Sequence, residues 1–408
     1  MNVCISCKSK KILNILSFGK IPISNDFTKL ANQKKMKKYK LGLNFCKSCF
    51  LVQNSMLINN KKIFNDNYLY HSSYSKSWLA HSKKLSDFCI KKFKLNSNSL
   101  VFEIASNDGY LLKYFKKKNI QTVGVEPSKS VAKVAKKKGI KTYVEFFSKN
   151  FVKKYKKKIV PNLIIALNVM AHTPKINSFV KALSQILNKH NVCIIEVPYV
   201  LNLIKKKQID TIYHEHYSYF SITSISNILR KFNLELFDIK LIKTHGGSLR
   251  LFVKKKNNVK FIINKKIKKF IRAEKKIGFN DEKFYKNFSV EVEKILKINE
   301  KKIKALCKNN NVIGYGAAAK ATIICNLLKL DKEHIRYIID KNIYKQSRYI
   351  PGTQIKIISD NILKKFKPDY VLIFVWNIKR EIISEITRNN KTLKFITFEP
   401  NFKIHKIK

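Results

Sequence analysis

Short apolar runs alternate with amphipathic, helix-like stretches from residue 100 onward, and this alternation is the main pattern of the chain. Stretches such as 131–138 and 176–187 place apolar residues at helical spacing, whereas the runs between them have the length of strands. Strands that alternate with helices favour a doubly wound, mostly parallel α/β sheet. The predicted strands of this first unit are 100–105, 122–126, 163–169, 192–197, 234–242 and 248–253.

A second strand–turn–helix pattern begins at 312–316. The Lys-rich stretch before it is predicted to be helical, because apolar residues recur there near helical spacing. These residues are Phe284, Phe288, Val292, Ile295 and Ile303. The further strands predicted are 335–339, 370–375 and 394–398. We therefore expect an N-terminal domain (1–75), an α/β domain (76–255), a helical connector (256–310) and a second Rossmann-like domain (311–408).

The cysteines fall into two groups. Cys4 with Cys7, and Cys46 with Cys49, form two C-x-x-C pairs that each offer two thiolates from one tight turn. Together they would complete a tetrahedral zinc (Zn²⁺) shell with no open coordination position, so we expect a structural metal. Reduced thiols or a redox pair are the alternatives, since the two pairs lie further apart than in an ordinary zinc ribbon. The remaining cysteines are predicted to be core residues: Cys89, Cys193, Cys307 and Cys325.

A turn of small residues at 103–109 joins the first predicted strand to a helix predicted at 110–117. Such a turn lets backbone amides approach a phosphate or carboxylate at the helix N-terminus. The second strand ends at Glu126, whose carboxylate can accept hydrogen bonds from both hydroxyls of a ribose. The pattern fits either a nicotinamide dinucleotide or S-adenosyl-L-methionine, and it lacks the full G-x-G-x-x-G fingerprint.

Tyr213, His214, Glu215 and His216 bring a phenol, two imidazoles and a carboxylate together between two predicted strands. A histidine whose pKa is near neutrality can remove a proton from a carbon next to a ketone. If the segment is extended, His214 and His216 share one face, which would also suit a metal site. A third interpretation is a helix-cap network of polar residues.

Six segments carry a resemblance that distinguishes between these cofactors: 103–109, 124–128, 168–172, 196–199, 213–216 and 245–250. In this order they resemble the motifs of the nucleotide-sugar C-methyltransferases, which use S-adenosylmethionine to methylate C3 of a 4-keto deoxyhexose. The C-x-x-C pairs with 22–25 resemble the zinc-binding head of that family, and 314–320, 351–353 and 376–377 resemble its C-terminal domain. The resemblance covers essentially the whole chain. It implies an α/β protein with a zinc-binding N-terminal head, a class I (Rossmann-like) methyltransferase domain and a second Rossmann-like C-terminal domain.

The resemblance also implies roles for single residues. His216 corresponds to the base that converts the substrate to an enolate, Glu215 and Tyr213 line the same pocket, and His172 contacts the developing oxyanion. Substrate contacts are expected for Tyr68, Tyr70, His214 and Lys320, the last through a phosphate. Cofactor contacts are implied for Glu103, Ala105, Asn107, Gly109, Glu126, Pro127, Ser128, Asn168 and Val169.

Ala105 departs from the family, which has glycine at this place in the first turn. If the position requires a positive φ or a close contact with the cofactor, the added methyl group would cost on the order of 1 kcal/mol. The affinity for the cofactor would then be lower than in the family.

The formal net charge is +58, from 84 basic and 26 acidic residues. Lysines are scattered over every region and only seven basic residues are arginines, although arginine is the better residue for forked phosphate and base contacts. We therefore interpret the charge as a solvated surface and expect no specific nucleic-acid partner. The positive field would favour an anionic substrate such as a nucleotide sugar.

No apolar run has the length needed to cross a bilayer, and the first residues show no apolar signal segment. We expect a cytoplasmic protein without a membrane partner, and a monomer. The competing functions are an RNA methyltransferase, a non-catalytic protein that binds nucleotide sugars, and a nicotinamide oxidoreductase that uses the second α/β unit.

Overall fold

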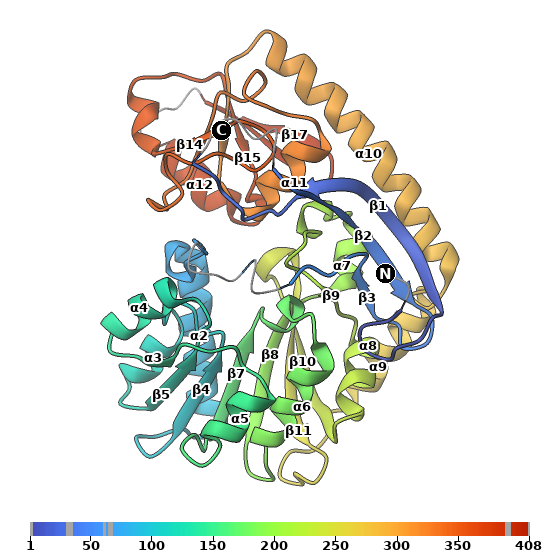
Figure 1. Ribbon diagram of the computed structural model, residues 1–408, viewed down its shortest axis with the longest axis vertical. Coiled ribbons are helices and arrows are strands. Elements are labelled where there is room, and N and C mark those ends of the chain that lie inside the picture. The colour runs from blue at the N-terminus through green and yellow to red at the C-terminus, as the bar shows by residue number, and fades with distance from the viewer. Residues whose placement is uncertain (1–2, 30–35, 60–62, 64–67, 388–392, 407–408) are drawn as a thin grey trace.

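The computed structural model describes residues 3–29, 36–59, 63, 68–387 and 393–406. Its strands form three sheets, and Figure 1 shows a seven-stranded sheet in the lower half and a six-stranded sheet in the upper half. Strands of the third sheet and the long helix α10 (Glu282–Lys308) run along one side of the molecule. The predicted fold class is confirmed: the protein is a mixed α/β structure with Rossmann-like sheets and an N-terminal cysteine cluster.

The seven-stranded sheet has the order β10-β11-β8-β7-β4-β5-β6. The five strands from β8 to β6 are parallel, whereas β11 is antiparallel to both of its neighbours. The carboxyl ends of the parallel strands therefore meet at one edge, where ligands bind in sheets of this kind. The strands are β4 (Leu100–Ile104), β5 (Gln121–Val125), β6 (Lys141–Tyr143), β7 (Leu163–Leu167), β8 (Val192–Pro198), β10 (Leu234–Ile242) and β11 (Ser248–Lys255).

Helices pack around this sheet and supply the loops at its edge. The α-helices are α2 (Lys76–Phe93), α3 (Leu112–Lys116), α4 (Lys129–Lys137), α5 (Lys149–Tyr155), α6 (Ile176–Ile186), α7 (Val200–Lys205) and α8 (Ile222–Arg230). Short 3₁₀ turns are η1 (Ser72–Tyr74), η2 (Met170–His172), η3 (Ile209–Thr211) and η4 (Thr244–Gly246). All residues of β7 are buried, which explains why its sequence is one continuous apolar run.

The C-terminal sheet has the order β14-β13-β12-β15-β16-β17, in which only β17 is antiparallel to its neighbour. This order is that of a Rossmann sheet. Its strands are β12 (Val312–Tyr315), β13 (Tyr337–Ile339), β14 (Lys356–Ile358), β15 (Tyr370–Ile373), β16 (Lys394–Phe398) and β17 (Phe402–His405). Its helices are α11 (Ala319–Leu327) and α12 (Lys379–Ile386), with the 3₁₀ turns η5 (Asp360–Lys364) and η6 (Trp376–Ile378).

The N-terminal sheet combines distant parts of the chain. Its order is β1 (Ile12–Pro22), β2 (Lys38–Cys46), β3 (Val52–Asn54) and β9 (Ser218–Tyr219). Strand β9 follows directly after the 213–216 motif, so this motif is built into the N-terminal sheet. The periodicity of the sequence did not predict these strands.

Helices α9 (Lys266–Lys276) and α10 occupy the stretch expected to be helical. Glu274 of α9 is almost fully buried and accepts hydrogen bonds from the Tyr199 hydroxyl at 2.8 Å and the Ile222 amide at 2.8 Å. Because that amide lies at the beginning of α8, the carboxylate stabilises the N-terminus of this helix. Helix α10 contacts β1 and β17, so it connects the N-terminal and C-terminal sheets.

Candidate active site

The turn after β4 has an unusual backbone. Ala105, Asn107 and Gly109 all have positive φ angles, of 56°, 49° and 75°. Side chains with a Cβ rarely adopt this conformation, so the glycine of the related family fits the position of Ala105 better than alanine does. A Cβ at Gly124 in the neighbouring strand would lie 2.2 Å from the Ser106 hydroxyl, so this glycine lets the turn approach β5.

Glu126 holds the two loops at this edge together. Its carboxylate accepts hydrogen bonds from the Asn107 amide at 3.1 Å and the Ser128 amide at 3.0 Å. Burial raises the pKa of Glu126 to about 7. Burial also raises the pKa of Glu103, which lies at the end of β4 beside the Tyr110 phenol. Two carboxyl groups thus face the place where the resemblance expects the cofactor.

Several buried acceptors at this edge have no hydrogen-bond partner within the described part of the chain. They are Ser106 Oγ, Asp108 Oδ1 and Asn168 Oδ1. Asn168 has a φ of 53°, and its amide donates to the Glu196 carbonyl at 2.8 Å, which fixes the loop after β7. Buried acceptors are normally satisfied, so this set fits a ligand that supplies donors, as the ammonium and ribose hydroxyls of S-adenosylmethionine do.

Pro127 and Ser128 follow Glu126 into α4, and Val169 follows Asn168 and packs against the core. The structure therefore brings the predicted cofactor residues to one edge of the sheet. The side chain of Asn107 has a different function in this arrangement: its Oδ1 accepts from the Ser72 amide at 2.8 Å, and its Nδ2 donates to the Tyr70 carbonyl at 3.2 Å.

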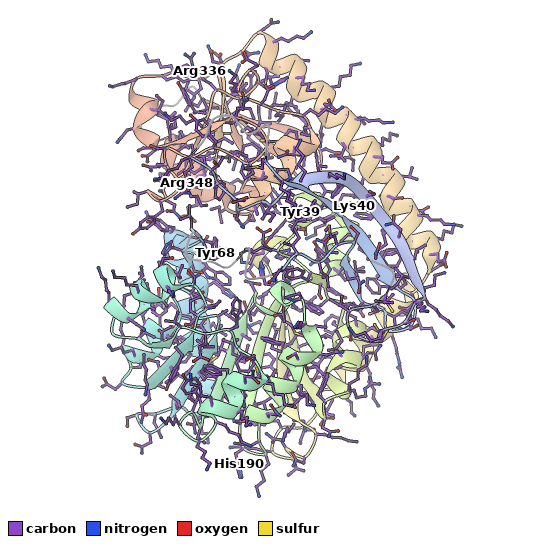
Figure 2. The ribbon with its side chains drawn as sticks, in the orientation of Figure 1. Tyr39, Lys40, Tyr68, His190, Arg336 and Arg348 are labelled. Carbon is purple, nitrogen blue, oxygen red and sulfur yellow. The ribbon has the colours of Figure 1, made fainter. Side chains whose placement is uncertain are left out.

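Residues 68–74 form a closing segment over the cofactor edge, because Asn107 binds its backbone. The rings of Tyr68 and Tyr70 lie 6.4 Å apart. Burial, together with neighbouring Tyr70, Glu126 and Glu215, raises the pKa of Tyr68, so this phenol lies between the cofactor edge and the 213–216 motif. Figure 2 shows Tyr68 between the lower and upper domains.

The C-terminal domain contacts the same closing segment. Asn342 Nδ2 donates to the Leu69 carbonyl at 2.6 Å, and the ring of Tyr344 stacks on His71 with centroids 5.4 Å apart. Both contacts come from the loop after β13. The closing segment is thus held by the cofactor loop on one side and by the C-terminal domain on the other.

The 213–216 motif forms a turn. The His216 amide donates to the Tyr213 carbonyl at 3.0 Å, and His214 points to the N-terminal strand β2, where its Nε2 donates to the Tyr39 carbonyl at 3.3 Å. The two imidazoles therefore do not share a face, and the extended interpretation is wrong. Among the described residues, only the four N-terminal cysteines bring three or more potential metal ligands together. A metal site at the motif is not supported.

His216 is held in one tautomer by its partners. Its Nδ1 lies 2.9 Å from the Thr211 carbonyl, which can only accept, so Nδ1 carries the proton. Its Nε2 then has a lone pair, which accepts from the Tyr213 hydroxyl at 2.7 Å. Burial lowers the pKa of His216 well below 6.5, and neighbouring His172 adds to this effect. The imidazole is therefore neutral and able to act as a base.

Glu215 and His172 lie beside this pair. The Oε1 atom of Glu215 accepts hydrogen bonds from the backbone amide of Asn25 at 3.3 Å and from its side chain at 3.1 Å. Its Oε2 is buried without a hydrogen-bond partner from another described residue, and burial raises the pKa of Glu215 to about 7. The ring of His172 lies 4.8 Å from that of His216, and burial lowers the pKa of His172 to about 4.

Lys320 is paired within the protein. Its Nζ lies 2.5 Å from Asp210 Oδ2, and the Trp376 indole donates to the same oxygen at 2.6 Å. Asp210 belongs to η3, next to the motif, so this buried pair joins the methyltransferase-like sheet to the C-terminal domain. A cavity of about 740 Å³ lies beside it. Its lining includes Asn202, Lys206, Lys207, Gln208, Lys243, Gly246, Phe398 and Glu399.

A second buried cluster lies at the ends of β8 and β11. Glu196 binds Arg250 Nε at 2.6 Å and His81 Nε2 at 2.8 Å, and His245 contacts Trp78 with ring centroids 5.0 Å apart. The motifs that contain Glu196, His245 and Arg250 were identified in the sequence, but His81, Trp78 and the ion pair of Glu196 with Arg250 were not. No spacing rule connects residues so far apart in the chain.

The four N-terminal cysteines converge as predicted. Their Sγ atoms lie within 4.8 Å of one another, and the amides of Ser6 and Cys7 both donate to Cys4 Sγ at 3.4 Å. Four thiols at this spacing fit a tetrahedral zinc ion. The isolated cysteines Cys89, Cys193 and Cys325 are buried as expected, whereas Cys307 is only half-buried.

Three protein families match consecutive parts of the chain. The family described as "Putative zinc binding domain" matches residues 4–64, the "Methyltransferase domain" matches 79–239, and the "C-methyltransferase C-terminal domain" matches 243–400. The C-methyltransferase NovU from Streptomyces niveus is 28% identical over 383 residues, which cover 93% of this chain and 91% of NovU.

Two solved structures are similar to part of the chain. The magnesium protoporphyrin IX methyltransferase ChlM from Synechocystis PCC 6803, with bound SAH, has a TM-score of 0.35 and 13% identity over 43% of this chain and 83% of ChlM. The PH0226 protein from Pyrococcus horikoshii OT3 has a TM-score of 0.37 and 12% identity over 46% of this chain and 94% of that protein. Among the described residues, the helices are all too short or too polar to span a bilayer.

Replacing Ala105 by glycine should relieve the strained turn. Because glycine adopts a positive φ without a steric penalty, we expect Ala105→Gly to raise the free energy of unfolding by up to about 1 kcal/mol and to leave binding of S-adenosylhomocysteine as tight or tighter. Chemical denaturation and calorimetric titration measure both. Ala166→Gly in β7 is the matched control and should destabilise by about 1 kcal/mol. Equal destabilisation by both variants would contradict the assigned strain.

The cysteine cluster should carry a metal. We expect about one zinc ion per chain in the purified protein, and Cys46→Ser should lose most of it because three thiolates and a weak hydroxyl no longer complete the shell. Elemental analysis measures the zinc content. Cys193→Ser, at a buried thiol in β8 outside the cluster, should keep its zinc. Full zinc retention in Cys46→Ser would show that the cluster is not the ligand set.

Proposed function

We propose that this chain, which belongs to the S-adenosylmethionine-dependent C-methyltransferases with an N-terminal zinc-binding domain, methylates the carbon next to the ketone of a nucleoside-diphosphate 4-keto deoxysugar. The proposed carbon is C3. The observation that carries the proposal is the neutral, buried His216, whose Nε2 accepts from the Tyr213 hydroxyl and whose ring lies 4.8 Å from that of His172 in the turn after β7. A carbon next to a ketone becomes a nucleophile only when it loses a proton, so this reaction needs such a base.

His216 would take the substrate proton on Nε2. The Tyr213 hydroxyl occupies that lone pair at 2.7 Å, so Tyr213 must turn aside or pass its own proton to Nε2 as it receives the one from carbon. The hydrogen bond from Nδ1 to the Thr211 carbonyl stabilises the imidazolium that results. The electrons of the broken C–H bond move into the ketone and form an enolate.

The enolate oxygen needs hydrogen-bond donors. His172 lies next to His216, and Glu215 has an unsatisfied Oε2 and a pKa raised to about 7, so its protonated form is accessible near neutrality. A buried donor stabilises developing negative charge more strongly than a solvated one. We assign the keto oxygen to this side of the pocket, with Tyr68 and Tyr70 closing over the sugar.

S-adenosylmethionine supplies an electrophilic methyl group that needs no further activation. The chain must hold it in line with the nucleophilic carbon and exclude water. Glu126 would bind the ribose hydroxyls, while Glu103 and the turn 105–109 would face the methionine end, where their side-chain oxygens would accept hydrogen bonds from the ammonium group. Pro127, Ser128, Asn168 and Val169 would form the rest of the cofactor loops.

The anionic part of the substrate would enter the cavity between the two Rossmann-like domains. Its volume of about 740 Å³ suits a nucleotide-sized ligand, and Lys206, Lys207 and Lys243 line it. Lys320 is neutralised by Asp210, so it would contact a phosphate only by leaving or sharing this pair. An RNA acceptor is less well supported, because such sites use aromatic stacking with arginines and the chain has few arginines.

The proposed partner is thus a nucleotide sugar, without a specific nucleic-acid or membrane partner. A single chain supplies all the groups assigned above, so a monomer suffices. We assign the reaction to the cytoplasm, where both substrates are made.

The decisive experiment supplies isotope-labelled S-adenosylmethionine and a panel of 4-keto nucleotide sugars, followed by mass analysis. The wild type should label one sugar on carbon. His216→Ala should lower turnover by at least about a hundredfold, because general-base catalysis contributes this much, and should bind S-adenosylhomocysteine normally. His190→Ala, at the opposite end of the sheet in Figure 2, is the control and should be fully active. Label in RNA but no sugar, or persistent turnover in His216→Ala, would refute the proposal.

The pH dependence follows from the lowered pKa of His216. Only the neutral imidazole can accept the proton, and a lowered pKa keeps it neutral at more acidic pH. We therefore expect kcat to fall on acidification only below pH 6.5, which is the ordinary pKa of a free histidine. Rates measured at saturating substrates, with binding of S-adenosylhomocysteine followed over the same range, test this. An acidic limb centred at or above pH 6.5 would contradict it.

A further inference from the structure

Strand β3 lies between the cysteine cluster and the 213–216 turn. Cys46 ends β2, Cys49 follows in the loop, and β3 begins at Val52. The strand pairs with β2 on one side and with β9 on the other, where Val52 lies opposite Tyr219. A short, fully buried strand therefore connects the expected zinc ligands to the segment that carries His216.

Gln53 points from β3 to the first cysteine turn. Its Oε1 accepts from the Ile5 amide at 2.9 Å, and its Nε2 donates to the Val3 carbonyl at 3.1 Å. The side chain is fully buried. These bonds lie on either side of Cys4, so the Gln53 side chain is bonded directly to the Cys4–Cys7 turn.

Asn54, the next residue, points the other way, as successive side chains of a strand do. Its Nδ2 lies 3.2 Å from the Tyr213 carbonyl and 3.5 Å from the His216 carbonyl, and its backbone amide donates to the Tyr217 carbonyl at 3.0 Å. Asn54 is also fully buried. One amide group thus reaches the carbonyls at both ends of the turn that presents the imidazole.

The cysteine head is itself fixed on the methyltransferase domain. Asn177 of α6 donates to the Ser6 carbonyl at 2.7 Å, and Asn227 of α8 donates to the Cys49 carbonyl at 3.5 Å. Both cysteine turns therefore have a rigid support. A shift of the first cysteine turn would move the 213–216 turn through β3, because Gln53 binds the cysteine turn and the neighbouring Asn54 binds the 213–216 turn.

We propose that Asn54 is a positioning residue for His216, and that β3 couples the order of the cysteine cluster to the geometry of the 213–216 turn. The consequence for catalysis rests on the proposed role of His216 as the base; the coupling itself does not. A base displaced by about 1 Å from the substrate proton can lose a hundredfold in rate, so a small change in this turn is sufficient. The cysteine cluster would then support the reaction without touching either substrate.

Asn54→Leu keeps the size of the side chain and removes the amide. We expect kcat and the exchange of the substrate α-proton with D₂O to fall in parallel by about ten- to a hundredfold. The affinity for S-adenosylhomocysteine and the KM should stay within a few-fold. Loss of folded protein would also reduce the number of S-adenosylhomocysteine sites per chain, whereas a defect in the base step lowers both rates and leaves one site per chain.

Asn191→Leu is the matched control. Asn191 is equally buried and donates to two backbone carbonyls, those of Pro161 and Ile186, near the far end of the sheet beside the labelled His190 in Figure 2. It should lose stability as Asn54→Leu does, but keep kcat and proton exchange. Equal effects of both variants on proton exchange, or no effect of Asn54→Leu, would overturn the positioning role.

Removal of the metal tests the coupling without a substitution and without a measurement of activity. Amide hydrogen exchange, followed by mass spectrometry, should accelerate several-fold at 213–219 when a chelator removes zinc, while β5 (121–125) stays protected. Unchanged exchange at 213–219, or equal acceleration in both regions, would refute the coupling. If His216→Ala retained turnover while these exchange rates still differed, the proposed base would be wrong and the coupling would stand.

Discussion

The hydrogen bond from His216 Nδ1 to the Thr211 carbonyl determines the chemistry available to the site. It leaves the other ring nitrogen with a lone pair, and burial keeps the ring uncharged. Without this bond, Nε2 would carry the proton in part of the molecules and would then donate a hydrogen bond where a lone pair is needed. The 3₁₀ turn η3 therefore does more than connect two elements, because it presents the carbonyl that selects the tautomer.

Two regions outside the segment 210–216 maintain this arrangement. Asn25, in the turn after β1, and Asn54 of β3 come from the N-terminal region, and Lys320 and Trp376 come from the C-terminal domain. All of them contact 210–216 through buried polar groups, which are stable only when both partners are present. The segment 210–216 carries Tyr213, Glu215 and His216, but the regions that contact it determine where these side chains point.

Much of this fold was predictable from the sequence, for local reasons. Buried parallel strands such as β7 are continuous apolar runs, and the paired cysteines carry their metal chemistry in their spacing. The four-stranded sheet was not predictable in this way, because β9 is two residues long and its partner lies far away in the chain. The sequence did not identify Asp210 and Asn54 for the same reason, because no local pattern distinguishes a carboxylate or an amide whose partner lies in another domain. The alternation of polar and apolar residues also could not predict the turn at 213–216, since its side chains are polar in either conformation.

The closing segment 68–74 has two anchors, the Asn107 side chain on the cofactor loop and Asn342 with Tyr344 on the C-terminal domain. Opening it requires breaking contacts on both sides at once. Access to the cofactor edge is therefore tied to how the C-terminal domain lies against the cofactor loop. One short segment thus links the position of the C-terminal domain to the exposure of the S-adenosylmethionine site.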